Sequence, residues 1–301
     1  MMDYRAIEAL VAVIECRGFE RAARRLNISQ PAVSQRIRQL EFRLGQPVLL
    51  RTSPPRLTET GQRLANHLQQ VQQLEQELLV TPETPAPLTI RLAVNADTLD
   101  TWLAKALSDC EYVPQMDFEL LVEDQDVGLK RMRNGEVMAC ICATAAPVNG
   151  GLSQPLGVMR YRALASPDYI RRWQLADRKD QLYRHPCLIY SADDRLQHLF
   201  LQSIAPQHAE PERSHRCPSS GGFVQMALAG LGYGMMPQLQ AEEHIRSGAL
   251  RDVVPGYYLD VPLYWHYWQT ESAMLKSLRL AVLNKARQVL LPAGEDAGKC
   301  S

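Results

Sequence analysis

The chain has 301 residues, 46% of them hydrophobic, and its 33 basic residues balance its 33 acidic ones. This length exceeds one small domain and allows two or three compact units. No apolar run is long enough to span a bilayer, and the charged N-terminus enters the first predicted helix without a signal peptide. We therefore expect a cytoplasmic protein, associated with the nucleoid if it binds DNA, and no membrane partner.

The first 44 residues predict three helices, because apolar residues recur at helical spacing in each of them. The first helix is closed by Gly18, and the second ends at Asn27, whose side chain tolerates the left-handed conformation. Ser29 is the predicted N-cap of the third helix, with Pro31 in its first turn, where no backbone N–H is needed. One buried stripe of the third helix is predicted to contain Val33, Ile37, Leu40 and Leu44.

The opposite face of the third helix is polar and basic, as in helices that read DNA. Gln and Ser hydrogen-bond base edges in a major groove, and Arg binds phosphate or guanine. For one helix alone an ordinary solvated face is the simpler interpretation, but residues 48–58 predict a hairpin around Pro54–Pro55, typical of a wing. The predicted DNA-binding residues are Ser29, then Gln30, Pro31, Ser34 and Gln35 as base readers, and Arg36, Arg38, Arg51 and Arg56 on phosphates.

Charge is segregated along the chain. Residues 1–63 contain eleven arginines, no lysine and six acidic residues, a formal charge of +5, so the remainder carries −5. This distribution is expected if only one end meets the phosphates of DNA. An architectural protein that coats or bends DNA is an alternative, but the large acidic remainder fits sensing better.

A long helix is predicted after the hairpin, with Thr58 as its cap. Its apolar stripe predicts a dimer seam, or alternatively packing on the chain's own core. The Pro-rich segment 81–87 predicts a linker that isolates this helix. Two DNA-binding domains held by one seam would bind the two halves of an imperfect inverted repeat, which lie about one helical turn apart. The predicted seam residues are Leu64, Leu68, Val71, Leu74 and Leu78.

From Leu88 the pattern alternates strands and helices, which predicts a mainly parallel sheet. A last helix closes the chain, with apolar positions from Leu275 to Val289. The predicted strands are 88–95, 118–123, 137–143, 186–190 and 233–236, and the predicted helices between them include 195–204 and 222–229.

Two segments of this part have the position of a ligand site, because ligands of open α/β folds lie beyond the carboxyl ends of strands, against helix N-termini. They are Asn95–Thr98 and Pro218–Gly222. Hydroxyl and N–H groups suit an α-carboxylate, and carboxylates suit a cationic side chain. Plain helix caps at Asp97 and Ser219 are the competing interpretation. The predicted effector-binding residues are Asp97, Thr98, Glu123, Asp124, Ser219 and Ser220.

The sequence does not predict an enzyme, a metal site or a cofactor. Gly230–Gly234 lacks the context of a dinucleotide loop, no His-Glu-x-x-His occurs, and Ser219–Ser220 lacks a nucleophile elbow. Seven scattered cysteines argue against a disulfide framework. Cys140 and Cys142 share one face of a predicted strand, which fits a sensor or, more simply, two small buried side chains.

Several motifs give the N-terminal 4–63 segment a specific resemblance to the LysR-type transcriptional regulators. They are Ser29-Gln-Pro-Ala-Val-Ser34, Leu44-Gly-Gln-Pro-Val-Leu-Leu-Arg-Thr52 and Leu57-Thr-Glu-Thr-Gly61. Runs at Arg17–Ala23, Arg51–Arg56, Leu92–Leu103 and Leu263–His266 resemble the branch of that family that responds to arginine and lysine, controls basic amino-acid export and has also been described as an inhibitor of chromosome initiation.

The resemblance implies an all-α winged helix-turn-helix domain, then an α/β part like a periplasmic binding protein, with two subdomains joined by crossing strands and the final helix returning to the first. It also implies a homodimer or homotetramer that binds double-stranded DNA and lysine or arginine, with RNA polymerase as a further partner. A regulator of a different small metabolite is the alternative. The predicted boundaries are 1–60 for the DNA-binding domain, 61–80 for the linker helix, 81–87 for the hinge, 88–161 with 266–301 for subdomain I, and 162–265 for subdomain II.

Overall fold

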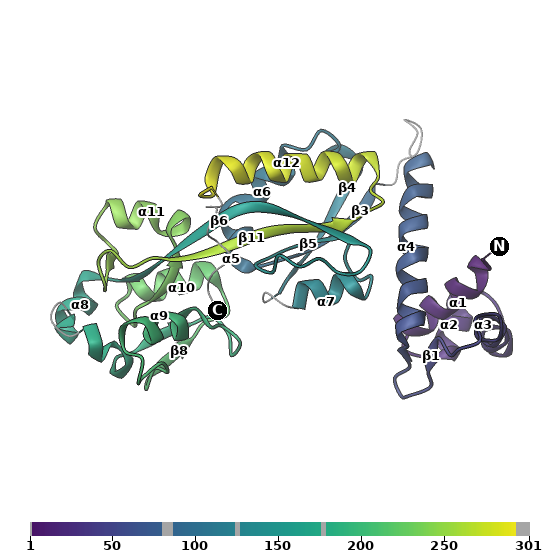
Figure 1. The fold of residues 1–301 in the computed structure, drawn as a ribbon, viewed down its shortest axis with the longest axis horizontal. Coiled ribbons are helices and arrows are strands. Elements are labelled where there is room, and N and C mark those ends of the chain that lie inside the picture. The colour runs from purple at the N-terminus through teal and green to yellow at the C-terminus, as the bar shows by residue number, and fades with distance from the viewer. Residues whose placement is uncertain (1, 80–86, 124–126, 176–178, 293–301) are drawn as a thin grey trace.

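The structure, a computed structural model, describes residues 2–79, 87–123, 127–175 and 179–292 (Figure 1). Most of the predicted hinge, and Asp124, lie outside these ranges. Among the described residues, no helix combines the length and the hydropathy that crossing a membrane would require.

The N-terminal domain has three helices and a short hairpin, as the sequence predicts. Ser29 caps the third helix, since its Oγ accepts a hydrogen bond from Ala32 N at 3.3 Å, and Asn27 adopts a left-handed φ of 53° before it. Val33, Ile37 and Leu40 are buried in the core of this domain. The elements are α1 (Tyr4–Glu15), α2 (Phe19–Arg25), α3 (Gln30–Leu44), β1 (Leu49–Leu50) and β2 (Arg56–Leu57).

The linker helix α4 (Glu59–Leu79) starts at the predicted cap, with Gly61 N donating to Thr58 Oγ1 at 3.1 Å. The prediction that its whole apolar stripe is a dimer seam is wrong for Leu64 and Leu68. Both are buried in the chain's own N-terminal core, where α4 packs against α1. The side chains of Leu74 and Leu78 lie outside the described residues.

In the described ranges the main sheet has seven strands, and the prediction that it is mainly parallel is wrong. β3 (Leu88–Val94) pairs in parallel with β4 (Met116–Val122) and β5 (Ala139–Cys142). β6 (Gly151–Ala165) and β11 (Leu259–Trp268) pair antiparallel over most of their length. β11 also pairs antiparallel with β5, and β9 (Gly234–Pro237) and β10 (Arg251–Asp252) with β6. The strand directions depend on pairing between strands about a hundred residues apart. The hydrophobic pattern within one strand does not indicate the direction of such a distant partner.

The long strands β6 and β11 run through both ends of the α/β part and divide it into two lobes (Figure 1). Lobe I contains β3 to β5 with α5 (Ala96–Thr98), the π-helix η1 (Leu99–Leu103), α6 (Ala104–Ser108), η2 (Val113–Gln115), α7 (Val127–Arg133) and α12 (Ala273–Val289). Lobe II contains α8 (Pro167–Trp173), η4 (Lys179–Arg184), β7 (Cys187–Ile189), α9 (Leu196–Ile204), β8 (Ser214–Arg216), α10 (Ser220–Leu228), α11 (Gln238–Arg246) and the strands β9 and β10.

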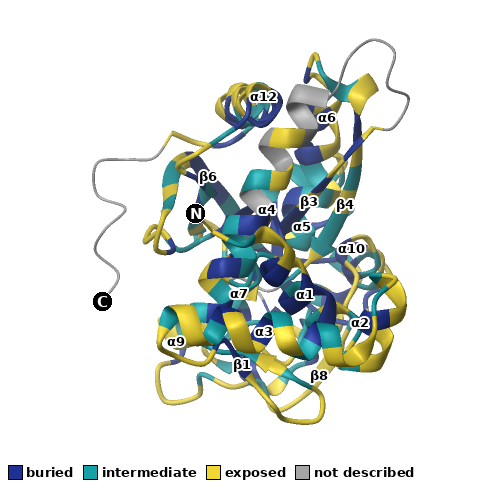
Figure 2. Ribbon diagram, turned by 90° about the vertical axis from the view of Figure 1, so that its right-hand side faces the viewer, coloured by how far each residue is buried: buried dark blue, intermediate teal, exposed yellow. Residues whose placement is uncertain are grey.

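The last helix returns to lobe I, as the resemblance implied. α12 packs on α6 and β6, and Figure 2 shows it nearly end-on, with buried residues on one side and exposed residues on the other. One hydrophobic core continues between the lobes, because it includes Ile90 of lobe I, Tyr161 and Trp265 of the crossing strands, and Tyr169 and Tyr233 of lobe II. The two lobes are therefore joined by packed side chains along the crossing strands.

Candidate DNA-binding surface and effector site

The polar residues of α3 form one outward surface. Gln30, Ser34 and Arg38 are spaced four residues apart and so lie along one side of the helix, with Gln30 and Arg38 exposed and Ser34 half-buried. Arg38 Nε donates to Ser34 O at 3.3 Å, which holds the guanidinium along the helix. Of the remaining predicted residues on this helix and its cap, Ser29, Pro31 and Gln35 are exposed and Arg36 is half-buried.

The hairpin places two exposed arginines beside this surface. Arg51 follows β1, and Arg56 opens β2, so they flank the tip of the hairpin. Glu41 of α3 fixes the base of the hairpin, because its carboxylate accepts from Val48 N at 3.1 Å and lies 3.8 Å from Arg51 Nη2. This contact between α3 and the hairpin holds the predicted base readers and the predicted phosphate-binding arginines in one arrangement.

Asp97 lies at the junction of the two lobes. It follows β3 in α5, and its two carboxylate oxygens accept from Tyr161 Oη at 2.7 Å and from Ser220 Oγ at 2.8 Å. Ser220 begins α10 of lobe II and is also 3.0 Å from Gln240 Oε1. The structure therefore brings together the predicted residues Asp97 and Ser220 across the lobes.

Further carboxylates gather around Asp97. Burial raises the pKa of Asp97, the hydrogen bonds from Tyr161 and Ser220 oppose that rise, and the nearby charges of Asp194 and Asp100 add to it. Asp194 comes from lobe II, where its carboxylate accepts from Tyr190 N at 3.0 Å and Leu196 N at 2.9 Å. The charges of Asp194 of lobe II and of the exposed Asp100 thus act on the Asp97 carboxylate.

Two polar oxygens beside Asp97 are buried without a hydrogen-bond partner among the described residues. They are Asn95 Oδ1 and Thr98 Oγ1, and Thr98 is fully buried. Buried polar atoms without partners are costly, so their presence is consistent with a site completed by a ligand. The π-helix η1 follows directly, a distortion found frequently at functional sites.

The other predicted effector residues have different surroundings. Ser219 is exposed and acts as the N-cap of α10, its Oγ accepting from Gly222 N at 3.1 Å, which agrees with the plain-cap interpretation. Asp97 is not a cap, since Asn95 occupies the N-cap position of α5. Glu123 is not a freely solvated carboxylate, because it pairs with Arg131 of α7 through Nε at 2.5 Å. Asp124 lies outside the described residues.

Sequence reasoning missed Asp194, Tyr161 and Gln240. Asp194 lies between β7 and α9, the same strand-to-helix position that selected Asn95–Thr98, so that signal was present in the sequence. Tyr161 and Gln240 reach the site from β6 and α11 through tertiary packing alone.

The cysteine pair lies in the sheet of lobe I. Cys140 and Cys142 are both buried in a small apolar cluster with Met132 and Trp268. Their strand β5 is paired with β11 at His266, whose ring lies within hydrogen-bond distance of Thr144 O at 2.7 Å through Nε2. The simpler interpretation of small buried side chains agrees with this burial. Within the described ranges, no group of three or more His, Cys, Asp or Glu side chains has a metal-binding arrangement.

Comparison with known proteins adds to this geometry. The family model described as the bacterial regulatory helix-turn-helix protein, lysR family, matches residues 4–62, and the LysR substrate binding domain matches residues 63–286. The HTH-type transcriptional regulator ArgP of Pseudomonas fluorescens is 48% identical over 297 residues, which are 97% of this chain and 99% of that protein.

Two solved structures cover the whole architecture. ArgP from Mycobacterium tuberculosis has a TM-score of 0.88 at 32% identity, over 97% of this chain and 100% of that one. Full-length LysG from Corynebacterium glutamicum with bound effector Arg has a TM-score of 0.85 at 29% identity, with the same coverage. The arrangement of the N-terminal domain, linker helix and both lobes is thus shared with full-length regulators.

Proposed function

Because this chain belongs to the LysR family of transcriptional regulators, we propose that it binds operator DNA and that arginine or lysine controls this binding. The observation that carries the effector assignment is the Asp97 carboxylate, which accepts hydrogen bonds from Tyr161 of β6 and Ser220 of lobe II and has the charges of two further aspartates nearby. A cationic side chain is the complementary group for such a site. The arginine bound to LysG and the shared architecture support the same ligand class.

In this proposal the effector holds the lobes in one arrangement. Asp97 and Thr98 belong to lobe I and Ser219 and Ser220 to lobe II, so a ligand between them contacts both. The carboxylates would bind the cationic groups, including the α-amino group, and the Ser219–Ser220 end of α10 would bind the α-carboxylate. An effector that binds one arrangement more tightly shifts the population toward it and changes how the DNA-binding domains sit on the operator.

We further propose a homodimer or homotetramer that acts in the nucleoid, controls genes of amino-acid export or metabolism, and contacts RNA polymerase. The N-terminal arginines support the DNA contact, since the net charge of residues 1–63 is +5. The alternatives are an architectural DNA protein and a regulator of another metabolite. Binding to the promoter DNA beside its own gene, measured with and without arginine across a series of salt concentrations, separates them. Arginine-dependent, sequence-specific binding supports the proposal, and salt-sensitive binding without sequence preference supports the architectural alternative.

Substitutions on α3 and in the hairpin are expected to separate base reading from phosphate binding. Ser34→Ala should weaken specific binding about 10-fold and leave non-specific binding nearly unchanged, because base contacts discriminate by about 1–3 kcal/mol. Arg51→Ala should weaken both and lower the salt slope by about one, because it removes a phosphate contact. Fluorescence anisotropy with operator and scrambled DNA measures both. Equal losses on the two DNAs for both variants would contradict this division.

A further inference from the structure

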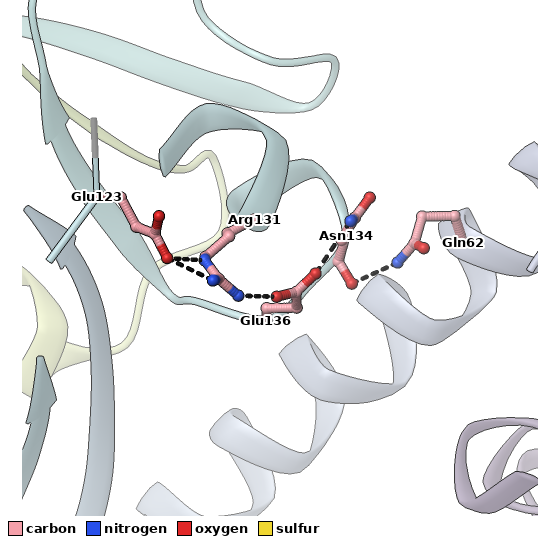
Figure 3. A network of polar contacts seen from close by, with 5 residues as sticks. All are labelled: Gln62, Glu123, Arg131, Asn134 and Glu136. Carbon is pink, nitrogen blue, oxygen red and sulfur yellow. Dashed lines mark hydrogen bonds and ion pairs between the residues drawn. The ribbon is translucent and has the colours of Figure 1, made fainter. Parts of the chain in front are cut away.

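The C-terminal end of α7 is capped by side chains of the linker helix. The last carbonyls of a helix have no partner within it. Asn66 Nδ2 of α4 donates to Arg133 O at 2.6 Å, and Gln62 Nε2 donates to Asn134 O (Figure 3). Gln62 Nε2 also donates to Asn66 Oδ1 at 3.0 Å, so the two amides act together. These contacts join the DNA-binding half of the chain to lobe I.

The surroundings of these contacts are loosely packed. A groove of about 460 Å³ lies beside them, lined by residues of α1, α4, β3 and β4 and by residues 134–136 after α7, among them Leu68, Leu121 and Glu136. Apolar packing between α4 and lobe I is therefore incomplete. The hydrogen bonds at α7 contribute to fixing the position of α4 relative to lobe I.

Arg131 connects the same helix to the end of β4. Its Nε donates to Glu123 Oε1 at 2.5 Å, and its Nη1 donates to Glu136 Oε2 at 2.6 Å. Asn134 Nδ2 donates to the other oxygen of Glu136 at 3.0 Å. Figure 3 shows the resulting line of contacts from Glu123 to Gln62, which we call the α7 bridge: Glu123, Arg131, Glu136, Asn134 and Gln62.

The first member of the α7 bridge lies at the same edge of the sheet as Asp97, because both residues follow the carboxyl ends of the paired parallel strands β3 and β4. Glu123 N donates to Val94 O at 3.0 Å, and Val94 is the last residue of β3, three residues before Asp97. The Glu123 side chain is only 19% exposed, so water replaces a lost partner poorly. A change in the partner of Glu123 therefore changes the contacts of Arg131.

We propose that Arg131 is a positioning residue that transmits effector binding to the linker helix through α7. This inference rests on the proposed function. A cationic effector that attracts Glu123 competes with Arg131 for that carboxylate, and α7 then changes its position against Gln62 and Asn66. In one arrangement of the α7 bridge Glu123 binds Arg131, and in the other it binds the effector. This difference in effector contacts is what coupling between distant sites requires.

Three variants of the full-length protein test this inference. Arg131→Gln removes the charge that holds Glu123, and the double variant Gln62→Ala/Asn66→Ala removes the caps of α7. Gln72→Ala is the matched control, because it deletes an exposed amide from the same helix. Calorimetry measures arginine binding, and operator affinity with and without arginine measures the response to the effector. Hydrogen–deuterium exchange without effector reports the local stability of residues 59–68 and 130–136.

Arg131→Gln and the double variant are expected to bind arginine within about 5-fold of the wild type, yet to lose the arginine-dependent change in operator affinity. Without effector, Arg131→Gln should raise exchange in residues 59–68, and the double variant should raise it in residues 130–136, whereas Gln72→Ala changes neither. An intact arginine response in both variants, or unchanged exchange in both segments, overturns the inference. If the wild type itself ignores arginine, the proposed function fails, and the exchange measurements alone decide whether the α7 bridge couples the two halves.

Discussion

Asp97→Asn is expected to abolish arginine binding while leaving the free protein at least as stable as the wild type at neutral pH. The affinity should fall at least about 30-fold, because removing one partner of a buried charge pair costs about 2–5 kcal/mol. The hydrogen bonds of the free protein survive. Tyr161 still donates to the Asn oxygen, and Ser220 accepts from the new amide while donating to Gln240, which is 3.0 Å away.

The pH dependence of stability provides an independent measurement of the same group. Burial raises the pKa of Asp97, so the native state holds the proton more tightly than the unfolded chain does. The stability linked to this group is fully present below the ordinary pKa of aspartate and is lost as the pH rises through the raised native pKa. The Asp97→Asn variant has no ionisable group at this position, so it does not lose this stability as the pH rises.

Thermal unfolding of both proteins at several pH values checks this expectation. The Tm of Asp97→Asn should equal or exceed that of the wild type at neutral pH, by up to about 4 °C, and the difference should shrink as the pH falls. A lower Tm at neutral pH would show that the Asp97 carboxylate stabilises the free fold. In that case a destabilised fold would explain the loss of arginine binding in Asp97→Asn, and the loss would not identify Asp97 as an effector contact.

Gly61→Ala is expected to disable the DNA-binding domain and leave the effector site intact. A Cβ at Gly61 would lie 1.9 Å from Val48 O and 3.2 Å from Leu57 Cδ2, so the methyl group would meet the backbone of the hairpin. The first turn of α4 and the hairpin must then separate, although Val48 O also accepts from Thr58 N at 3.1 Å. The arginines of the hairpin are displaced with it.

Overpacking of this kind costs about 1–3 kcal/mol or more, and we expect operator affinity to fall at least about 10-fold. Gly18→Ala is the matched control in the same domain, because a Cβ there meets no heavy atom within 4 Å. Operator binding, arginine binding and Tm are measured on both variants. Unchanged operator affinity in Gly61→Ala, or equal losses in the two variants, would contradict this account of the contact between α4 and the hairpin.

The N-terminal domain was predictable because its signals are local. The cap at Ser29, the left-handed Asn27 and the apolar stripe of α3 each depend on residues within one or two turns. β6 and β11 carry no comparable signal, because their exposed positions alternate irregularly and each contains a proline, Pro155 and Pro262. Their antiparallel pairing joins residues a hundred positions apart, so the direction of the sheet was predicted wrongly.

The candidate effector site was predictable in part for the same reason. Asp97 and Ser220 lie at strand-to-helix junctions, which the sequence marks, and the structure brings them within 2.8 Å. The partners of these two residues come from elsewhere in the fold, as Tyr161 and Gln240 show. The pairing of Glu123 with Arg131 was also missed, because an acidic residue near a strand end gives no indication of which cation it meets.

The most direct test of the central claim is a calorimetric titration of the full-length protein with arginine, lysine, citrulline and leucine. Citrulline has nearly the shape of arginine but an uncharged side chain, so this comparison isolates the cationic side-chain group. We expect saturable binding of a basic amino acid, and citrulline binding at least about 30-fold weaker than arginine, because the carboxylates around Asp97 would face a neutral group. Equal binding of arginine and citrulline, or binding of neither basic amino acid, would contradict the assignment of this site.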